Sequence, residues 1–385
     1  SGALGTAEIT YEKKGASGGY TQVSAPTDAG DYRVTVRCET SDEIFVGSAA
    51  FTIAPKSIEG AAVTAPALTY TGTPQSIADG TTVTLDGTPL VTNTDFRFDG
   101  TFSADKAGSY QAQVRGTGNY SGCVDVPWKI DPKTVTADVT VNGGPFTYTG
   151  SEIRPAVTVK DGETSIPDTE YTLSYSRSQN AGMGTVTVMD REGGNYTVSG
   201  QAQFEIRQAD QLVTAAPLSA VYGESGRTLT VTGAQGQLAY AVKPGGEDIL
   251  SVSADGVLTF KKAGTAVVLI TAAETNNYKP SNTAEVPVTV AKASAVIRAA
   301  DRSAYIGAAA PDLSSPKQGT DYTVSGMVGG DQPEGITVSL AYASQPDMSK
   351  AGTFVIHPSV AGTDGRYDFA CEDGTLTVAP RPSSG

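Results

Sequence analysis

The sequence is poor in the residues on which many enzymes and metal sites depend. It has one histidine and three cysteines in 385 residues. Nucleophilic catalysis with a histidine base or a cysteine thiolate is therefore excluded as a main function, and so are zinc sites built from these ligands. We accordingly predict that the chain is not an enzyme, with no catalytic residues, no metal ligands and no cofactor.

Basic charge and long apolar runs are also scarce. The chain has 27 basic and 41 acidic residues, a formal net charge of −14. A chain this acidic repels nucleic acid and anionic membranes, so neither is expected as a main partner. The longest apolar stretch, residues 266–273, has the length of a strand, whereas a membrane helix needs about 18 apolar residues. We therefore predict no membrane insertion.

The cysteines are too far apart to suggest a disulfide framework. Cys38, Cys123 and Cys371 are separated by 85 and 248 residues, and no CxxC motif occurs. Cys38 alternates with the apolar residues of a strand pattern and is interpreted as a small buried hydrophobe. No signal segment is recognised, and Ser1-Gly2 resembles a cloning scar. We expect an excerpt whose targeting signals lie outside it.

What the sequence does contain is one pattern in five copies. Each copy has an Ala-Gly pair followed by alternating apolar and polar residues, at Ala29, Ala107, Ala181, Ala263 and Ala351. The spacings between these alanines are 78, 74, 82 and 88 residues. Self-similarity at such a period indicates tandem repeats that are slightly smaller than an immunoglobulin domain.

Three further marks keep register with the Ala-Gly pair. A tyrosine preceded by Asn or Arg follows it at Tyr120, Tyr196, Tyr278 and Tyr367. A Tyr-x-Gly or Tyr-Gly turn opens four of the repeats, at Tyr70, Tyr148, Tyr222 and Tyr305. Each repeat closes on a strand with two inward positions, Phe51/Ile53, Trp128/Ile130, Phe204/Ile206, Val288/Val290 and Leu376/Val378.

The period within these segments is two. In residues 32–38, Tyr, Val, Val and Cys share one face and Arg, Thr and Arg the other. Such alternation predicts half-buried antiparallel strands, and the Gly, Asn, Asp and Pro clusters between them predict turns. No sustained helical stripe occurs. We therefore predict an all-β chain, a tandem array of immunoglobulin-like β-sandwich domains arranged as an elongated rod.

The repeat marks set the predicted domain boundaries. These are a partial module at 1–54, immunoglobulin-like modules at 55–132, 133–208, 209–292 and 293–380, and a tail or linker at 381–385. Pro55 and Pro132 stiffen their junctions and end strands there. Because the junctions are short, we expect little swivel. At ~3.3 Å per strand residue, five modules would reach roughly 150–175 Å.

The first module is predicted to lack its first strands. Tyr70 precedes Ala107 by 37 residues, and the equivalent of Tyr70 before Ala29 would fall ahead of residue 1. An unpartnered sheet edge is prone to pair with other chains. We expect these strands either to pack on the second module or to borrow strands from a neighbouring molecule, and otherwise a monomer.

The repeats resemble bacterial immunoglobulin-like modules of secreted or cell-surface proteins. The third, with residues 145–150, 168–175 and 204–206, is similar to modules of large secreted Gram-positive gut proteins. The fifth, with Tyr305-Ile-Gly307 and Gly374-Thr-Leu-Thr-Val378, is similar to the MBG type. The fourth, with residues 251–258, is similar to the group 2 bacterial type found in adhesins. The resemblance implies an extracellular setting at the bacterial cell surface or cell wall, and no binding residues.

Several residues fit chemical motifs but have structural interpretations. Gly15-Ala-Ser-Gly-Gly19 matches the nucleophile elbow, which needs a strand-to-helix turn and a histidine base. His357 lies in another repeat and is predicted to face outward, so we interpret residues 15–19 as a hairpin loop. Trp128 is assigned to the core of its repeat rather than to a sugar platform. Asn119-Tyr-Ser and Asn195-Tyr-Thr fit the glycosylation sequon by chance.

Carboxylates gather in four close pairs, Asp28/Asp31, Asp99/Asp105, Asp161/Glu163 and Glu372/Asp373. Paired carboxylates can serve glycoside hydrolysis or calcium binding. None shows the alternate acidic spacing of a calcium loop, so we interpret them as solvated turn residues. An interdomain calcium site stays open as an alternative.

These features favour a structural function. We predict a stiff acidic stalk or spacer of a bacterial cell-surface protein, which holds another domain away from the wall. The alternative is an adhesin or ligand-binding module that contacts a host protein or glycan. The ligand-binding residues are unknown in that case.

Overall fold

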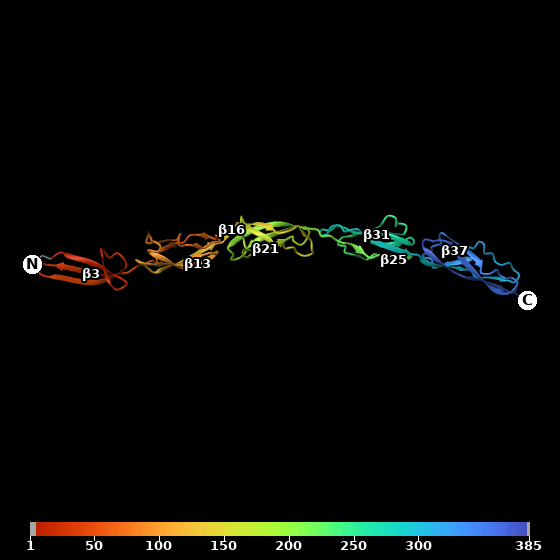
Figure 1. The fold of residues 1–385 in the computed structure, drawn as a ribbon, viewed down its shortest axis with the longest axis horizontal. Coiled ribbons are helices and arrows are strands. Elements are labelled where there is room, and N and C mark those ends of the chain that lie inside the picture. Colours follow the sequence, from red (N-terminus) through yellow and green to blue (C-terminus); the bar gives the residue numbers. More distant parts are fainter. Residues whose placement is uncertain (1–4, 383–385) are drawn as a thin grey trace. The chain divides into compact units, whose positions relative to one another are not determined.

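The computed structural model describes residues 5–382. Residues 1–4, with the Ser1-Gly2 pair, and residues 383–385 of the predicted tail lie outside the described part. The ribbon consists almost wholly of strands and loops (Figure 1). Within residues 5–382, one 3₁₀ turn, η1 (Asp168–Glu170), is the single helical element. The prediction of an all-β chain is confirmed.

The chain divides into two compact units by its contacts. One takes in the chain up to Pro145 together with Ile153–Ser178 and Met183–Glu205. The other takes in Phe146–Glu152, Gln179–Gly182 and the chain from Ile206 onward. The first unit holds the first two repeats and most of the third, and the second unit holds the fourth and fifth.

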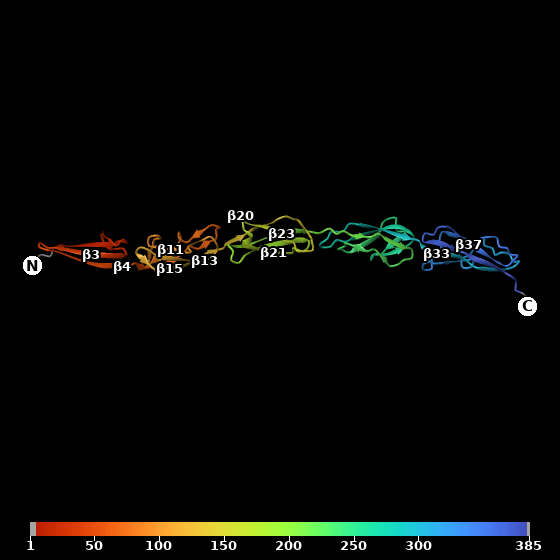
Figure 2. The same ribbon diagram turned by 60° about the horizontal axis from the view of Figure 1, so that its bottom comes forward.

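The first repeat is a single antiparallel sheet in the order β2-β1-β3-β4. Its strands are β1 (Ala7–Lys14), β2 (Tyr20–Val23), β3 (Gly30–Glu39) and β4 (Ile44–Ile53). Figure 2 shows it as one layer at the red end of the chain. No second sheet accompanies it among the described residues.

The second repeat has two main sheets. The larger has the order β11-β13-β15-β7 and the smaller β10-β9-β6, with two short pairs β12-β8 and β14-β5 beside them. The strands of the larger sheet are β7 (Leu68–Thr69), β11 (Phe96–Gly100), β13 (Gly108–Gly116) and β15 (Cys123–Asp131). The others are β5 (Lys56–Ser57), β6 (Ala62–Thr64), β8 (Gln75–Ser76), β9 (Thr82–Leu85), β10 (Thr88–Pro89), β12 (Ser103–Ala104) and β14 (Tyr120–Ser121).

The third repeat follows the same plan. Its larger sheet has the order β16-β23-β22-β21, with β18 also beside β23, and its smaller sheet is β17-β19-β20. The strands are β16 (Lys133–Thr136), β17 (Asp138–Val141), β18 (Phe146–Thr147), β19 (Val157–Asp161), β20 (Thr164–Ser165), β21 (Tyr171–Ser176), β22 (Gly182–Asp190) and β23 (Tyr196–Arg207).

The fourth repeat has a sheet of order β25-β32-β31-β28, a sheet of order β26-β30-β29 and the short pair β24-β27. The strands are β24 (Thr214–Ala215), β25 (Leu218–Val221), β26 (Arg227–Thr228), β27 (Val231–Thr232), β28 (Leu238–Val242), β29 (Leu250–Val252), β30 (Val257–Phe260), β31 (Gly264–Ala272) and β32 (Ala284–Ala291).

The fifth repeat has two sheets, β34-β39-β37-β36 and β35-β33-β38. The strands are β33 (Ala293–Ala299), β34 (Arg302–Tyr305), β35 (Tyr322–Ser325), β36 (Ile336–Tyr342), β37 (Gly352–Gly362), β38 (Tyr367–Glu372) and β39 (Gly374–Ala379). Repeats two to five are therefore two-sheet structures, as predicted, while the first is one sheet.

Separate clusters of buried apolar side chains lie inside repeats two to five. They run from Ile58 to Ile130, from Val135 to Val198, from Val213 to Val290 and, as the main cluster of the fifth repeat, from Ala299 to Val378. The alternating residues of the long strands enter these clusters, because one face of each sheet turns toward the other sheet. Trp128 is among them with 5% of its surface exposed, as predicted.

The prediction that the strands pair antiparallel is only partly right. An early strand of each complete repeat runs parallel to its closing strand, in the pairs β7–β15, β18–β23, β25–β32 and β34–β39. A parallel pair needs a long connection, and the intervening strands of the repeat supply it. The alternation of apolar residues is the same for both directions, so it could not distinguish them.

The interior predicted for the first repeat is wrong in part. Tyr32 is buried with 2% exposure, but Val36 is 39% exposed. Cys38, predicted to be buried, is half-exposed, and so are Phe51 and Ile53. These residues do share one face, but no second sheet covers that face within residues 5–382. It does not pack on the second repeat either, since Ile9 and Phe45 on the same face are 54% and 57% exposed.

Candidate functional site

The recurring sequence marks meet where one repeat follows another. In repeats one to four the Ala-Gly pair lies at the start of a long strand, namely β3, β13, β22 and β31. This is the end of each repeat at which the chain passes on to the next repeat. The Asn-Tyr pair of the following repeat lies against it. Marks that the sequence showed as separate features therefore form one contact.

The first of these contacts joins repeats one and two. The backbone N–H of Ala29 donates to the side-chain oxygen of Asn119 at 2.7 Å. The Asn119 amide nitrogen donates in turn to the Asp28 carboxylate at 3.0 Å. The asparagine side chain thus uses both its acceptor and its donor on the preceding repeat.

The same contact recurs at the next two junctions. Ala107 N–H donates to Asn195 Oδ1, and Ala181 N–H donates to Asn277 Oδ1, each at 2.9 Å. The backbone carbonyl of each asparagine accepts a hydrogen bond from the backbone N–H of a residue at the start of its own repeat, from Lys56, Lys133 and Ala209 respectively, at 2.9 Å. We call this arrangement the asparagine clasp.

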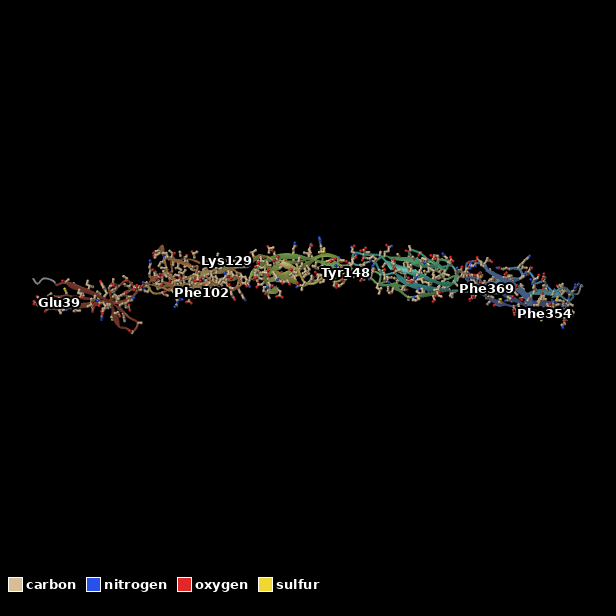
Figure 3. The ribbon with its side chains drawn as sticks, turned by 45° about the horizontal axis from the view of Figure 1, so that its top comes forward. Glu39, Phe102, Lys129, Tyr148, Phe354 and Phe369 are labelled. Carbon is tan, nitrogen blue, oxygen red and sulfur yellow. The ribbon has the colours of Figure 1, made fainter. Side chains whose placement is uncertain are left out.

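A tyrosine pair lies beside two of the clasps. The rings of Tyr70 and Tyr196, and those of Tyr148 and Tyr278, meet edge to face with centroids 5.3 Å apart. Figure 3 labels Tyr148 in the third repeat. Edge-to-face aromatic pairs contribute beyond the area they bury. Each pair joins the turn of one repeat to the Asn-Tyr mark of the next.

The junction of repeats four and five keeps the plan with different chemistry. Arg366 stands where the other repeats have asparagine, and the Ala263 N–H donates to the backbone carbonyl of Gly365 at 2.8 Å. Tyr222 and Tyr367 pair edge to face at 5.4 Å. The contact therefore needs no asparagine side chain when a loop carbonyl takes its place.

A partly buried polar network reinforces this junction. Asp331 accepts hydrogen bonds from the hydroxyl of Tyr222 at 2.9 Å and from that of Tyr367 at 2.7 Å. Arg366 lies 3.5 Å from the same carboxylate and also contacts Asp364, whose side chain is wholly buried. One carboxylate of the fifth repeat thus binds a tyrosine from each side of the junction.

The network shifts the ionisation of its members. Burial of the phenol raises the pKa of Tyr367 to about 12, and its hydrogen bond to Asp331 adds to the rise. Burial also raises the pKa of Tyr222. The hydrogen bond from Tyr367 lowers the pKa of Asp331. The neutral phenols and the charged carboxylate are thus the forms that the folded junction favours.

One predicted mark is out of register. Tyr70, Tyr148 and Tyr222 each donate a backbone hydrogen bond to the last residue of the closing strand, whereas in the fifth repeat Ile306 does so. Tyr305 lies one residue earlier and is 49% exposed. Because side chains alternate along a strand, a shift of one residue turns Tyr305 away from the tyrosine position.

The other candidate motifs take ordinary structural positions. Residues 15–19 form the hairpin loop between β1 and β2, closed by a hydrogen bond from Gly15 N–H to the Gly19 carbonyl. His357 is exposed, as predicted, and its Nδ1 lies 2.5 Å from Asp373. Trp128 donates its indole N–H to the Thr101 carbonyl at 2.7 Å, which fixes its ring in the interior.

The carboxylate pairs are divided among different partners. Asp28 contacts Asn119, Asp99 binds Arg115 and Asp161 binds Lys133. Within residues 5–382, no three His, Cys, Asp or Glu side chains gather as a metal site would require. Cys38, Cys123 and Cys371 are free cysteines.

Two surface hollows lie near these features. One, of about 610 Å³, lies beside the clasp of Asn277 and is lined by amides and Glu274. The other, of about 550 Å³, lies over Tyr110 and Trp128 on β13 and β15, near Lys129 in Figure 3. Trp128 is buried, so the second hollow has no exposed indole on which a sugar ring could stack.

Sequence reasoning found the marks but not their contact. The asparagine, the Ala-Gly pair and the tyrosine all recur at turns. In a domain that folds alone, such a turn does not require the same polar residue in every copy. A polar turn residue that repeats at the domain period is the signal that could have indicated a contact between repeats.

The clasp makes a direct prediction about Asn277. Asn277→Ala removes the acceptor of the Ala181 N–H, so that amide should exchange with solvent roughly five- to tenfold faster, the equivalent of about 1 kcal/mol for one hydrogen bond. The matched control is Asn276→Ala, since Asn276 is exposed beside it. Amide exchange measured by NMR should change at Ala181 in the first variant alone, and equal rates in both would contradict the clasp.

Comparison with known proteins identifies one repeat. Residues 295–377 match the family model of the MBG domain (YGX type). The fifth repeat is an MBG domain. The resemblance stated for this repeat is confirmed, while the group 2 assignment of the fourth repeat stays a prediction. No curated protein sequence matches the chain.

The comparison with solved structures finds matches at low identity and low superposition scores. The surface-layer protein SbsC, domains 1–6, has 13% identity and a TM-score of 0.21, and the match covers 92% of this chain and 62% of that one. Drosophila N-cadherin EC1–4 has 10% identity and a TM-score of 0.21, covering 96% and 92%. Invasin, a bacterial integrin-binding protein, has 11% identity and a TM-score of 0.23, covering 78% and 74%. Superposition scores this low do not bear on function.

No helix within residues 5–382 is both long enough and apolar enough to cross a membrane.

Proposed function

We propose that this chain is a structural stalk or spacer of a bacterial cell-surface protein, which presents another domain away from the wall. The observation that carries the proposal is the asparagine clasp. Three successive junctions use the same contact, in the pairs Ala29–Asn119, Ala107–Asn195 and Ala181–Asn277. Because this contact recurs between repeats and does not form one outer surface, it favours a function in holding the repeats together over the binding of a ligand.

The clasp would make each added repeat extend the array with little swivel. Each of repeats two to five buries its own apolar cluster, so its stability does not require a particular neighbour. The hydrogen bonds at the junctions, together with the ring pairs at three of them, would then limit the swivel between neighbours. An MBG domain and an all-β fold are typical of structural or binding modules, and we place the chain outside the cell, at the bacterial surface or wall.

Small-angle X-ray scattering tests this function. A rod of five repeats should give a radius of gyration of roughly 45 Å, from its length divided by √12 at ~3.3 Å per strand residue. A compact globule of the same length would give about 21 Å. A value near the compact one would overturn the stalk.

The alternative is adhesion to a host protein or glycan. It would require selective binding by the chain itself. On an array of glycans and extracellular-matrix proteins, a spacer should bind nothing selectively. Tight binding to one class of ligand would replace the stalk by the adhesin.

A further inference from the structure

The sheet of the first repeat has one apolar face that no second sheet covers within residues 5–382. The side chains of Ile9, Val34, Val36, Cys38, Phe45 and Phe51 share it, because directly paired residues lie on the same side of a sheet. Ile9, Val36 and Phe45 are 54%, 39% and 57% exposed. We call this surface the open face. The opposite face carries the ion pair of Glu12 and Arg33.

Comparison within the chain shows that the open face has the pattern of a covered one. Val36 follows the alanine of its Ala-Gly pair by seven residues. The residues at the same place in repeats two, three and four are Val114, Val188 and Ile270, which are 0%, 1% and 0% exposed. In the second repeat, Val83 and Leu85 of the smaller sheet belong to the same cluster as Val114. The first repeat lacks that smaller sheet among the described residues.

The edge of the same sheet is open as well. In the complete repeats the closing strands β15, β23, β32 and β39 have a parallel partner on their outer side. β4 is the last strand of its sheet and pairs only with β3. Its residues Ile44, Phe45 and Val46 are all more than half exposed, at 53%, 57% and 63%. An exposed apolar edge strand is a template for pairing.

We propose that the open face and the outer edge of β4 together bind one segment of the kind that opens repeats two to five. That segment supplies a strand parallel to β4 and a small sheet whose Val, Ile or Leu side chains cover the face. The inference does not depend on the stalk function, since it concerns how the first repeat completes its interior.

A second copy of the chain fits these two features less well. Two identical β4 edges related by a two-fold axis would pair antiparallel and leave both open faces exposed. Two open faces packed on each other would leave both edges unpaired. A segment like residues 133–168, which holds β16 to β20, satisfies the edge and the face together.

The thiol of Cys38 reports on the open face. In the full chain with Cys123→Ser and Cys371→Ser, Cys38 is the one remaining cysteine. A copy of residues 133–168 is joined ahead of Gly5 in place of residues 1–4. The added segment ends at the correct position, because Leu173 pairs with Val188 as Ile9 pairs with Val36. Residue 168 therefore corresponds to residue 4 of the first repeat. A second extension uses residues 55–93, because Phe98 pairs with Val114 in the same way.

We expect at least a tenfold slower reaction of Cys38 with a thiol reagent in at least one extended chain than in the chain without an extension. The matched control carries Val159→Asp in the copied segment only, since the native Val159 is 2% exposed in the covering sheet; it should restore fast labelling. Unchanged labelling with both extensions would overturn the proposal. A second result would also overturn the proposal: the chain without an extension forms a dimer in light scattering, and Cys38 is protected in that dimer. The open face would then be covered by a second copy of the chain.

Discussion

Replacing Tyr367 with alanine is expected to destabilise the MBG domain by roughly 3–5 kcal/mol, the usual cost of truncating a large buried aromatic side chain. Tyr367 is 1% exposed and packs with Ala293, Ala295 and the ring of Tyr222. The truncation removes this packing and leaves the Asp331 carboxylate without its shortest hydrogen bond. The substitution should therefore affect both the domain and its junction with the fourth repeat.

Amide exchange along β33 is the suitable measurement, because several separate cores make one free energy of unfolding for the whole chain ill-defined. Tyr367→Phe keeps the ring and should cost about 1–3 kcal/mol for the unsatisfied polar partners. Tyr305→Phe is the matched surface control, since Tyr305 is 49% exposed, and should stay within about 0.5 kcal/mol. Equal effects of Tyr367→Ala and Tyr305→Phe would contradict the assigned role of Tyr367.

Alkaline pH should destabilise the junction of the fourth and fifth repeats in the unmutated protein. The pKa of Tyr367 is raised from an ordinary 10.0 to about 12. A raised pKa means that folding favours the neutral phenol, so this contribution is complete below pH 10 and is lost as the pH rises from 10 to about 12. A difference of this size corresponds to roughly 3 kcal/mol.

The contribution can be followed by amide exchange in β33 between pH 9 and 12, after correction for the intrinsic rate of exchange. Tyr367→Phe cannot ionise at this position, so its loss of protection over the same range should be markedly smaller. An identical pH profile in both proteins would show that other groups govern the alkaline transition.

The sequence predicted the faces of the strands well because burial follows side-chain alternation. Trp128 and Ile130 in the closing strand of the second repeat are 5% and 1% exposed, as expected for its inward positions. The same alternation assigned Val36 to an inward face, and that residue is 39% exposed. Alternation identifies which residues share a face, but it does not show whether another sheet covers them.

Strand direction and register needed the structure. A period of two is the same in parallel and antiparallel pairs, so the parallel pairing of β7 with β15 left no mark in the sequence. The Tyr-x-Gly pattern also fits Tyr305 by sequence alone, although Ile306 makes the equivalent backbone hydrogen bond.

The candidate site was harder still, because it joins residues about ninety positions apart. Asn119 and Asn195 were visible as repeated marks, and each also fits a glycosylation sequon. Their hydrogen bonds to Ala29 and Ala107 reach back to the preceding repeat. Nothing in a single sequence specifies which turn of one repeat faces which turn of the next.

The parallel pairing of early and closing strands has a mechanical consequence. The chain enters the second repeat through β5, which pairs parallel with β14, and it leaves at the end of β15. β7 follows β5 and β6 in the chain, lies beside β15 and points the same way. Tension applied along the chain therefore pulls the two strands past each other in shear. Their hydrogen bonds bear the load together and do not break one after another. The repeat should therefore unfold at a higher force than an antiparallel hairpin whose hydrogen bonds break in sequence.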